Sequence, residues 1–268
     1  MGLLIHRLLT LLNTEEPNST NYHIAMTFLQ NYDSISTLSI GSMATLCSVS
    51  KSTLSKFARS IGFEDYFDLK DKAPFKENRF QFNLNYVSNI LTPIENEGTD
   101  PYFEAIIKDI QFYQKSINLE TIDRLANDLI KYENVAAFGL LFSESAAIDF
   151  QYKLAYNQKF IFTCLSDIEQ EKFIGNAKED TLVIIFSNSG DYVKKNQLKE
   201  GNFQKKIFQK TKAKIVLVTS NSKMVKSKDI DYCILFHHET SSQTHYFMYQ
   251  IVTDMIVHRY RYFKQSII

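Results

Sequence analysis

The hydrophobic pattern is most regular in residues 40–63, where it predicts two short amphipathic helices. In the second helix apolar side chains recur at positions i, i+3, i+4 and i+7: Leu54, Phe57, Ala58 and Ile61. The first helix repeats this spacing with Ile40, Met43, Ala44 and Cys47. Such spacing puts the apolar side chains on one face, toward a core. Ser50 is placed to cap the start of the second helix and Gly62 to end it. Two short helices with a tight turn between them predict a helix-turn-helix.

The outer face of the second helix is small, polar and basic. No acidic residue lies between Val49 and Phe63, although this stretch carries three cations. An acidic side chain there would repel a phosphate backbone. An ordinary solvated surface helix is the alternative. We predict that this helix enters the major groove of DNA. The expected contact residues are Ser50, Lys51, Ser52, Thr53, Ser55, Lys56 and Arg59.

Beyond residue 105 the pattern changes to short β-rich runs that alternate with helical stretches. The runs span residues 135–141, 159–164, 181–187, 214–220 and 232–238. Each run is too short and too rich in β-branched residues for a helix. The alternation predicts a five-stranded parallel sheet between helices, closed by a helix over residues 242–263.

Three of the strand ends are rich in serine, at residues 140–145, 187–190 and 219–222. Ligands of such sheets bind outside the carboxyl ends of the strands. At residues 187–190 a buried strand runs into two serines and a glycine before a helix, so hydroxyls and backbone N–H groups converge. This arrangement predicts an anion site, with a simple tight turn as the alternative. The candidate ligand-binding residues are Ser143, Ser187, Asn188, Ser189 and Gly190.

Composition and length refine this picture. A chain of 268 residues indicates about two domains, and its formal net charge is zero. Three of the four prolines, Pro74, Pro93 and Pro101, mark a linker. We therefore predict an all-α helix-turn-helix domain over residues 1–75, a linker over 76–105 and an α/β domain over 106–268. The first domain has six Lys/Arg against seven Asp/Glu. This weak charge favours a dimer that doubles the DNA contacts.

The three cysteines are odd in number and show no metal-ligand spacing. This pattern favours reduced thiols in a cytoplasmic protein without metal or cofactor. Residues 1–13 are interrupted by His6 and Arg7 and indicate an amphipathic helix, not a signal peptide. No apolar run is long enough to cross a bilayer.

Two motifs resemble the RpiR family of transcriptional regulators, and the resemblance extends over nearly the whole chain. The stretch "MATLCSVSKSTLSKFARSIGFEDYFDLK" follows the family's helix-turn-helix pattern, with Lys56 where the family usually has arginine. The matching positions are Val49, Ser50, Thr53, Lys56, Phe57, Gly62 and Phe63. The stretches "FGLLFSESAAIDFQYKL" and "DTLVIIFSNSG" resemble strand-loop units of the SIS domain, a sugar-phosphate-binding fold. This resemblance implies phosphate contacts at Ser143, Ser187, Ser189 and Gly190, with Asp149 and Lys153 on the helix that follows Ser143.

Two positions depart from the family pattern. Leu141 replaces the second glycine of the Gly-x-Gly-x-Ser loop, and Tyr192 stands where a small hydroxyl residue is usual. The leucine predicts that a ligand approaches this loop less closely. Because no cation is fixed by the sequence at this edge, we expect Lys153 or Lys194 to be the nearest candidates.

The resemblance implies a regulator of sugar metabolism genes that binds operator DNA and a phosphosugar-like effector, as a homodimer or a dimer of dimers. Two alternatives stay open. One is a sugar-phosphate isomerase whose general base comes from His237, His238, Glu239 or His245. The other is a regulator whose SIS domain only dimerises.

Overall fold

The computed structural model describes residues 3–73, 87–194, 205–240 and 244–266. Its contacts divide the chain into two compact units, with the main division after Gln81. The described part of the predicted linker, residues 87–105, is helical apart from Gly98 and Thr99. The boundaries at residues 75 and 105 stay predictions.

The first unit is all-α, as predicted. Its helices are α1 (Leu3–Thr14), α2 (Thr20–Gln30), the 3₁₀ turn η1 (Tyr32–Ser34), α3 (Ile40–Leu46), α4 (Lys51–Ser60) and α5 (Tyr66–Lys72). Local capping sets where four of them begin. The caps of α2 to α5 each accept a hydrogen bond from the backbone N–H three residues further on: Ser19, Ser39, Ser50 and Asp65. The core centres on Phe28, whose ring lies 5.6 Å from the ring of Phe57.

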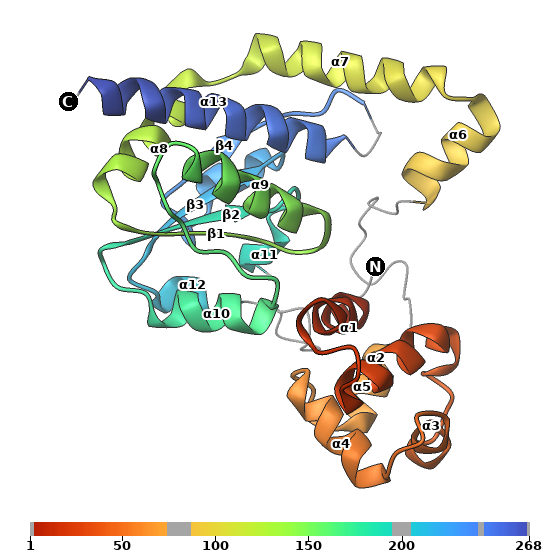
Figure 1. Ribbon diagram of the computed structural model, residues 1–268. Helices are drawn as coiled ribbons and strands as arrows, with labels where there is room; N and C mark the ends of the chain where they lie inside the picture. The colour runs from red at the N-terminus through yellow and green to blue at the C-terminus, as the bar shows by residue number, and fades with distance from the viewer. Residues whose placement is uncertain (1–2, 74–86, 195–204, 241–243, 267–268) are drawn as a thin grey trace. The chain divides into compact units, whose positions relative to one another are not determined.

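The second unit is an α/β domain built on a parallel sheet, as Figure 1 shows. The four strands are β1 (Asn134–Gly139), β2 (Thr181–Phe186), β3 (Lys214–Thr219) and β4 (Tyr232–Leu235), in that order across the sheet. The longer helices are α7 (Asp100–Ser116), α8 (Leu119–Lys131), α9 (Glu144–Ala155), α10 (Asp167–Asn176) and α13 (His245–Gln265). The shorter ones are η2 (Val87–Leu91), α6 (Thr92–Glu97), η3 (Leu141–Ser143), α11 (Asp191–Lys194), α12 (Ile207–Lys210) and η4 (Ser222–Lys226).

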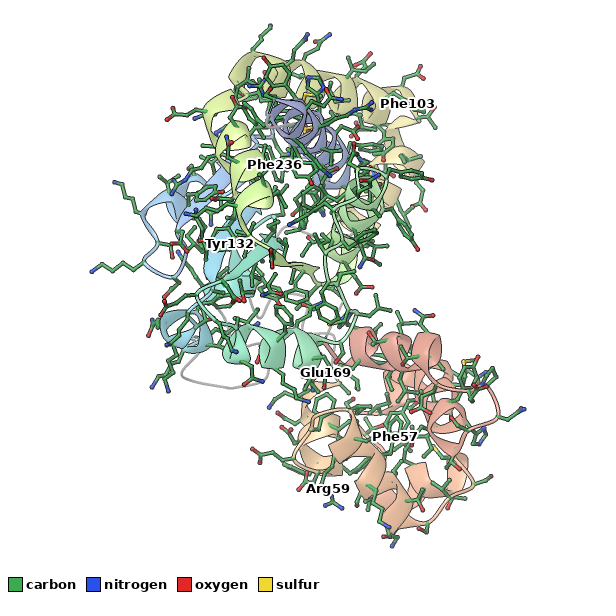
Figure 2. The ribbon with its side chains drawn as sticks, turned by 60° about the vertical axis from the view of Figure 1, so that its left-hand side comes forward. Phe57, Arg59, Phe103, Tyr132, Glu169 and Phe236 are labelled. Atoms are coloured by element: carbon green, nitrogen blue, oxygen red, sulfur yellow. The ribbon has the colours of Figure 1, made fainter. Side chains whose placement is uncertain are left out.

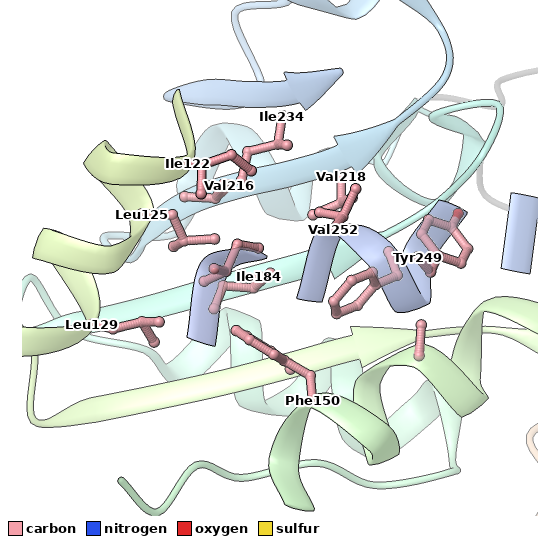
Figure 3. Close-up of a cluster of buried hydrophobic side chains, with 14 of the residues drawn as sticks. Ile122, Leu125, Leu129, Phe150, Ile184, Val216, Val218, Ile234, Tyr249 and Val252 are labelled. Atoms are coloured by element: carbon pink, nitrogen blue, oxygen red, sulfur yellow. The ribbon is translucent and has the colours of Figure 1, made fainter. Parts of the chain in front are cut away.

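Helices cover both faces of this sheet, because side chains alternate along each strand. In β2, for example, Ile184 packs into one buried cluster and Ile185 into the other. The larger cluster, drawn in Figure 3, joins the strands to α8, α9 and α13 through side chains such as Leu125, Phe150 and Tyr249. The smaller one lies on the opposite face, toward α10, α11 and α12. The α/β fold class is therefore confirmed.

The predicted fifth strand, residues 159–164, was wrong. Only one residue of this run joins the sheet, since Phe162 forms a single parallel bridge with Ala136. In a parallel ladder the next residue to bond β1 is Cys164. Its carbonyl instead accepts a hydrogen bond of 2.7 Å from the Gln170 side chain. The run therefore ends after one bridge and the sheet has four strands.

The structure records no disulfide between Cys47, Cys164 and Cys233. Cys47 and Cys233 are buried, whereas Cys164 is partly exposed. Burial raises the pKa of both Cys47 and Cys164 to about 11. Within the described ranges, no helix is long and apolar enough to span a membrane.

Candidate functional site

The turn between α3 and α4 is closed by its own backbone. Ser48 adopts a positive φ of 53°, which bends the chain between the helices. The Val49 N–H then donates to the Ala44 carbonyl at 2.9 Å. Ser50 caps α4 by accepting from the Thr53 N–H at 3.0 Å, and its hydroxyl also lies 2.9 Å from the Thr53 hydroxyl. Two of the seven predicted DNA contacts thus also form the helix cap.

The two faces of α4 are divided as predicted. The four apolar side chains of residues 54, 57, 58 and 61 are all buried. By contrast, Lys51, Ser52, Lys56 and Arg59 are exposed, and Ser55 is partly exposed. Figure 2 shows Arg59 projecting away from its helical unit. The structure records no hydrogen bond or ion pair that joins the side chain of Lys56 or Arg59 to another described residue.

A tight loop follows β2, and its two serine hydroxyls bond the next backbone turn. Ser187 is buried and accepts from the Tyr192 N–H at 3.3 Å, while Ser189 accepts from the Asp191 N–H at 3.2 Å. Gly190 has a positive φ of 79°, and a Cβ there would lie 2.6 Å from Met224. Only glycine fits this position without strain.

The loop after β3 fastens residues 187–190. The Asn188 carbonyl accepts from the Thr219 hydroxyl at 2.8 Å and from the Ser220 N–H at 3.1 Å. The Asn221 amide donates to the Ser189 carbonyl at 2.7 Å. Two of the three serine-rich strand ends are therefore joined by hydrogen bonds.

The third strand end is connected through an aromatic side chain. The Ser143 hydroxyl lies 3.3 Å from the Tyr249 hydroxyl, and the ring of Tyr249 lies 5.4 Å from that of Phe186, which ends β2. Burial raises the pKa of the adjacent Glu144 to about 7. This acid can therefore be neutral when an anion binds nearby.

The loop after β1 keeps a glycine-like backbone at Leu141, which has a φ of +58°. A left-handed conformation costs a non-glycine residue about 1–2 kcal/mol. Gly139 cannot carry a side chain for a different reason: a Cβ there would lie 2.4 Å from the Ser143 carbonyl oxygen. The loop thus keeps the shape that a second glycine would give it and adds an apolar side chain.

We expect Leu141→Gly to unfold at higher urea concentration than Leu141→Ala, by about 1 kcal/mol of unfolding free energy, because only alanine is strained at this φ. The same pair of substitutions at Ser145, an exposed helical position in α9, gives the control. There alanine should be the more stable, by about 1 kcal/mol. The same order at both positions would contradict the prediction.

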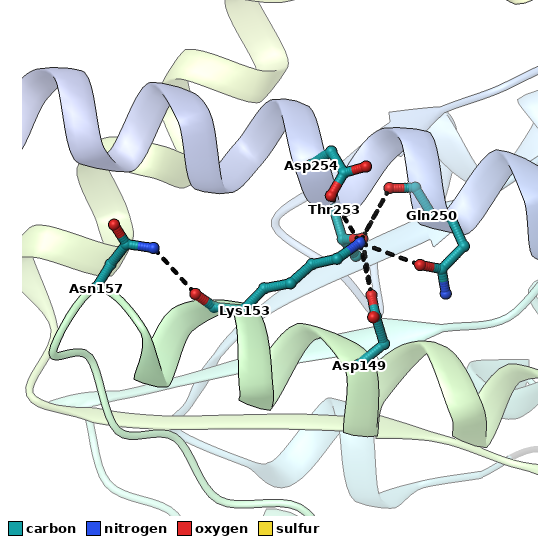
Figure 4. A network of polar contacts seen from close by, with 6 residues as sticks. All are labelled: Asp149, Lys153, Asn157, Gln250, Thr253 and Asp254. Atoms are coloured by element: carbon teal, nitrogen blue, oxygen red, sulfur yellow. Dashed lines mark hydrogen bonds and ion pairs between the residues drawn. The ribbon is translucent and has the colours of Figure 1, made fainter.

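The cation implied by the resemblance is neutralised. In Figure 4 the Lys153 ammonium reaches across from α9 to α13, 2.8 Å from Asp149 and 2.7 Å from Asp254. It also donates to the Thr253 hydroxyl at 3.0 Å. Both Asp149 and Lys153 therefore serve a helix–helix network. Lys194, the other candidate cation, is exposed at the end of α11.

Gln170 is a buried residue that sequence reasoning missed. Its side-chain amide donates to the carbonyls of Gly139 and Cys164, and its oxygen accepts from the Tyr192 hydroxyl at 2.7 Å. It therefore connects the end of β1 to the turn after residues 187–190. Nothing in the polar stretch around Gln170 distinguishes it from its exposed neighbours.

Each of the four residues considered as an isomerase base makes different contacts. His237 packs edge-on against Phe112, and Glu239 forms an ion pair with Lys108 at 3.3 Å. His245 is buried, and burial lowers its pKa to about 4. His238 lies between Asn188 and a buried carboxylate.

The structure thus combines a helix-turn-helix that exposes a basic helix with a parallel α/β domain. Residues 8–72 match the family model described as "Helix-turn-helix domain, rpiR family". The first unit therefore carries a helix-turn-helix domain of the RpiR type.

Two relatives are HTH-type transcriptional regulators. HexR of Pseudomonas aeruginosa is 25% identical over 181 residues, which cover 66% of this chain and 61% of HexR. The match therefore spans less than two thirds of that relative. An uncharacterized regulator of Providencia stuartii, in the aarA 3′ region, is 24% identical over 198 residues, 71% of this chain and 67% of its own length.

Solved structures resemble this one at lower identity. The NanR protein of Vibrio vulnificus, complexed with ManNAc-6P, has a TM-score of 0.49 at 14% identity and covers 98% of this chain and 94% of its own. The sugar isomerase domain of an RpiR transcription factor from Sphaerobacter thermophilus has a TM-score of 0.42 at 12% identity, over 63% of this chain and 98% of its own.

Proposed function

We propose that this protein is a DNA-binding transcriptional regulator whose α/β domain senses an anionic metabolite. The observation that supports DNA binding is the acid-free basic face of α4, exposed while the opposite face is buried. Side chains that are small or cationic permit close approach to the major groove and contact with phosphates. The relatives named as HTH-type transcriptional regulators support the same function.

The proposed effector site comprises the loop of residues 187–190 together with Ser143. Hydroxyls and backbone N–H groups near this edge suit an anionic oxygen, and the ManNAc-6P of the NanR structure suggests a phosphosugar. The site supplies polarity, not a fixed positive charge, since Lys153 is already held by two carboxylates. A sugar with several hydroxyls therefore suits it better than a bare phosphate.

The effector proposal is tested by thermal shift with a panel of sugar phosphates. A ligand held only by the folded state stabilises it by about 2.7 kcal/mol at a hundred times its dissociation constant. Intact DNA binding with no response to any member of the panel would favour a domain that only dimerises. Turnover of a sugar phosphate by the purified protein would favour the isomerase alternative.

We also propose a homodimer that uses an apolar stripe on α7. Phe103, Ile107 and Ile110 recur at helical spacing and are 58%, 53% and 36% exposed, and Figure 2 shows Phe103 on the outside of its unit. The neighbouring face of α7, with Ile106 and Tyr113, is buried in the domain. A second copy is the favoured occupant because helix-turn-helix proteins read two half-sites as dimers.

We expect sedimentation equilibrium at micromolar concentration to give about twice the chain mass of 31.1 kDa. Ile107→Asp should shift the protein toward monomer, because a buried unpaired charge costs several kcal/mol at an interface. Lys115→Asp, on an exposed part of α7 outside the stripe, should leave the mass unchanged. A monomeric mass for the parent protein would refute the dimer.

A further inference from the structure

Asp109 is a fully buried carboxylate on α7, with an exposed fraction of 0%. One oxygen accepts from the backbone N–H groups of Glu239 and Thr240, each at 2.8 Å. The other accepts from the hydroxyls of Thr240 and Thr244. Although burial alone raises the pKa of Asp109, the hydrogen bonds from Thr244 and Thr240 hold it below its ordinary value. This charged side chain fastens α7 to the connection between β4 and α13.

His238 lies on that connection and contacts both α7 and the loop after β2. Its Nδ1 atom lies 2.8 Å from the Thr244 hydroxyl and 3.5 Å from the Asp109 carboxylate. Its Nε2 atom lies 3.3 Å from the side-chain oxygen of Asn188. The ring is mostly buried and packs edge-on against Phe236 at 5.4 Å. One imidazole thus bridges the loop after β2 and the buried carboxylate of α7.

We infer that Asn188, His238 and Asp109 form a relay that couples the effector loop to α7. This inference rests on the proposed function, because it describes how ligand binding at the proposed effector site would affect α7. Asn188 is a candidate ligand contact, and Asp109 lies on the helix that carries the exposed apolar stripe. A ligand that moves the Asn188 side chain breaks its contact with His238. The contact of His238 with Asp109 on α7 then changes as well. His238 is a positioning residue in this scheme.

A second set of contacts ties the same two elements, so a displacement of the connection reaches α7 at more than one point. Lys108 pairs with Glu239, and Phe112 packs against His237 with ring centroids 6.4 Å apart. Residues 108, 109 and 112 therefore all meet the connection after β4. Packed and ion-paired contacts of this kind can carry energetic coupling between two surfaces.

The relay is tested first without any ligand, by amide hydrogen exchange of α7 in the full-length protein. Asn188→Ala should speed exchange of α7 amides by at least about twofold, the smallest effect typical of residues coupled in one network. The matched control is Asn221→Ala, which releases the same loop from its other side and has no contact with His238. In a His238→Phe background, Asn188→Ala should have no further effect on α7. Equal effects of Asn188→Ala in both backgrounds, or no effect in either, would overturn the relay.

The second arm adds inorganic phosphate or glucose 6-phosphate as probe. A probe that raises the Tm of the parent should slow α7 exchange there. In His238→Phe it should still raise Tm but leave α7 exchange unchanged, while His237→Phe should behave as the parent. Slowed exchange in His238→Phe as well would overturn the relay. If neither probe raises the Tm of the parent, the effector proposal loses its support for these anions, and the ligand-free arm alone decides the relay.

Discussion

Replacing Lys56 and Arg59 together by alanine is expected to weaken DNA binding at least about fivefold and to leave the fold intact. Each residue is worth about 1–3 kcal/mol if it contacts a base edge. A phosphate contact would instead weaken all sequences alike and lower the salt slope by about one unit per residue. The fold should survive because both side chains are exposed and α4 is held by Leu54, Phe57 and its cap at Ser50.

The measurement is fluorescence anisotropy with a duplex that the parent protein selects from random-sequence DNA, at several salt concentrations. A matched control removes two exposed lysines of the α/β domain, Lys206→Ala with Lys210→Ala. This control makes the same change in net charge, so a general electrostatic effect would weaken both variants equally. Unchanged affinity of the Lys56/Arg59 double variant would contradict the assignment of α4 as the DNA-reading helix.

The helix-turn-helix was predictable because its determinants are local. The burial of Leu54 and Phe57 follows from spacing along one helix. Capping by Ser50 was also readable, since it involves a bond to a residue three positions away. Gly62 ends the helix at a positive φ of 81°, as glycine at that position predicts.

The sheet was predictable in type but not in strand number. Residues 159–164 have the composition of a strand, and Phe162 does pair with β1 at one point. What ends the pairing is a side chain from another element, Gln170, at the Cys164 carbonyl. Composition and periodicity carry no information on such a tertiary hydrogen bond. Between the predicted strands 214–220 and 232–238, where the alternation predicts a helical stretch, the chain likewise forms only the short 3₁₀ turn η4, Ser222–Lys226.

The loops of the candidate site were predicted from the sequence. The ion pairs of its charged residues were not. Parallel strands bring their carboxyl ends to one edge, which is why three serine-rich ends pointed to one site. The pairing of Lys153 with Asp254 depends on how α9 packs against α13, which spacing within α9 cannot show. The burial of Asp109 could have been predicted, since it lies on the same helix face as Ile106 and Tyr113, at positions i, i+3 and i+7. An acidic side chain on a buried helix face indicates that hydrogen-bond donors surround it.

The second large effect is expected at the proposed effector site, where Ser187→Ala with Ser189→Ala should abolish the response of DNA binding to an anionic effector. Coupling between an effector and a ligand site is typically about 1–3 kcal/mol, so the parent's DNA affinity should change about 5- to 150-fold on effector binding. The double variant should show no such change. Its ligand-free DNA affinity should match that of the parent, because neither hydroxyl contributes to the helix-turn-helix unit.

The hydroxyls also bond the N–H groups of Asp191 and Tyr192, so their loss has a structural cost. Removal of a capping hydroxyl costs about 0.5–2 kcal/mol. The loop should keep its position, because its carbonyls remain bonded from the β3 side by Thr219 and Asn221. A thermal melt of the double variant measures this cost separately from the response.

Ser116→Ala with Ser266→Ala is the matched control for this response, since those two hydroxyls bond helix carbonyls away from the strand ends. The experiment titrates operator DNA with and without a sugar phosphate that stabilises the parent. If the Ser187/Ser189 variant responds as the parent does, the effector binds elsewhere. If no sugar phosphate or related anion binds the parent, then Leu141 marks a domain that has lost its ligand, and the sensing proposal fails.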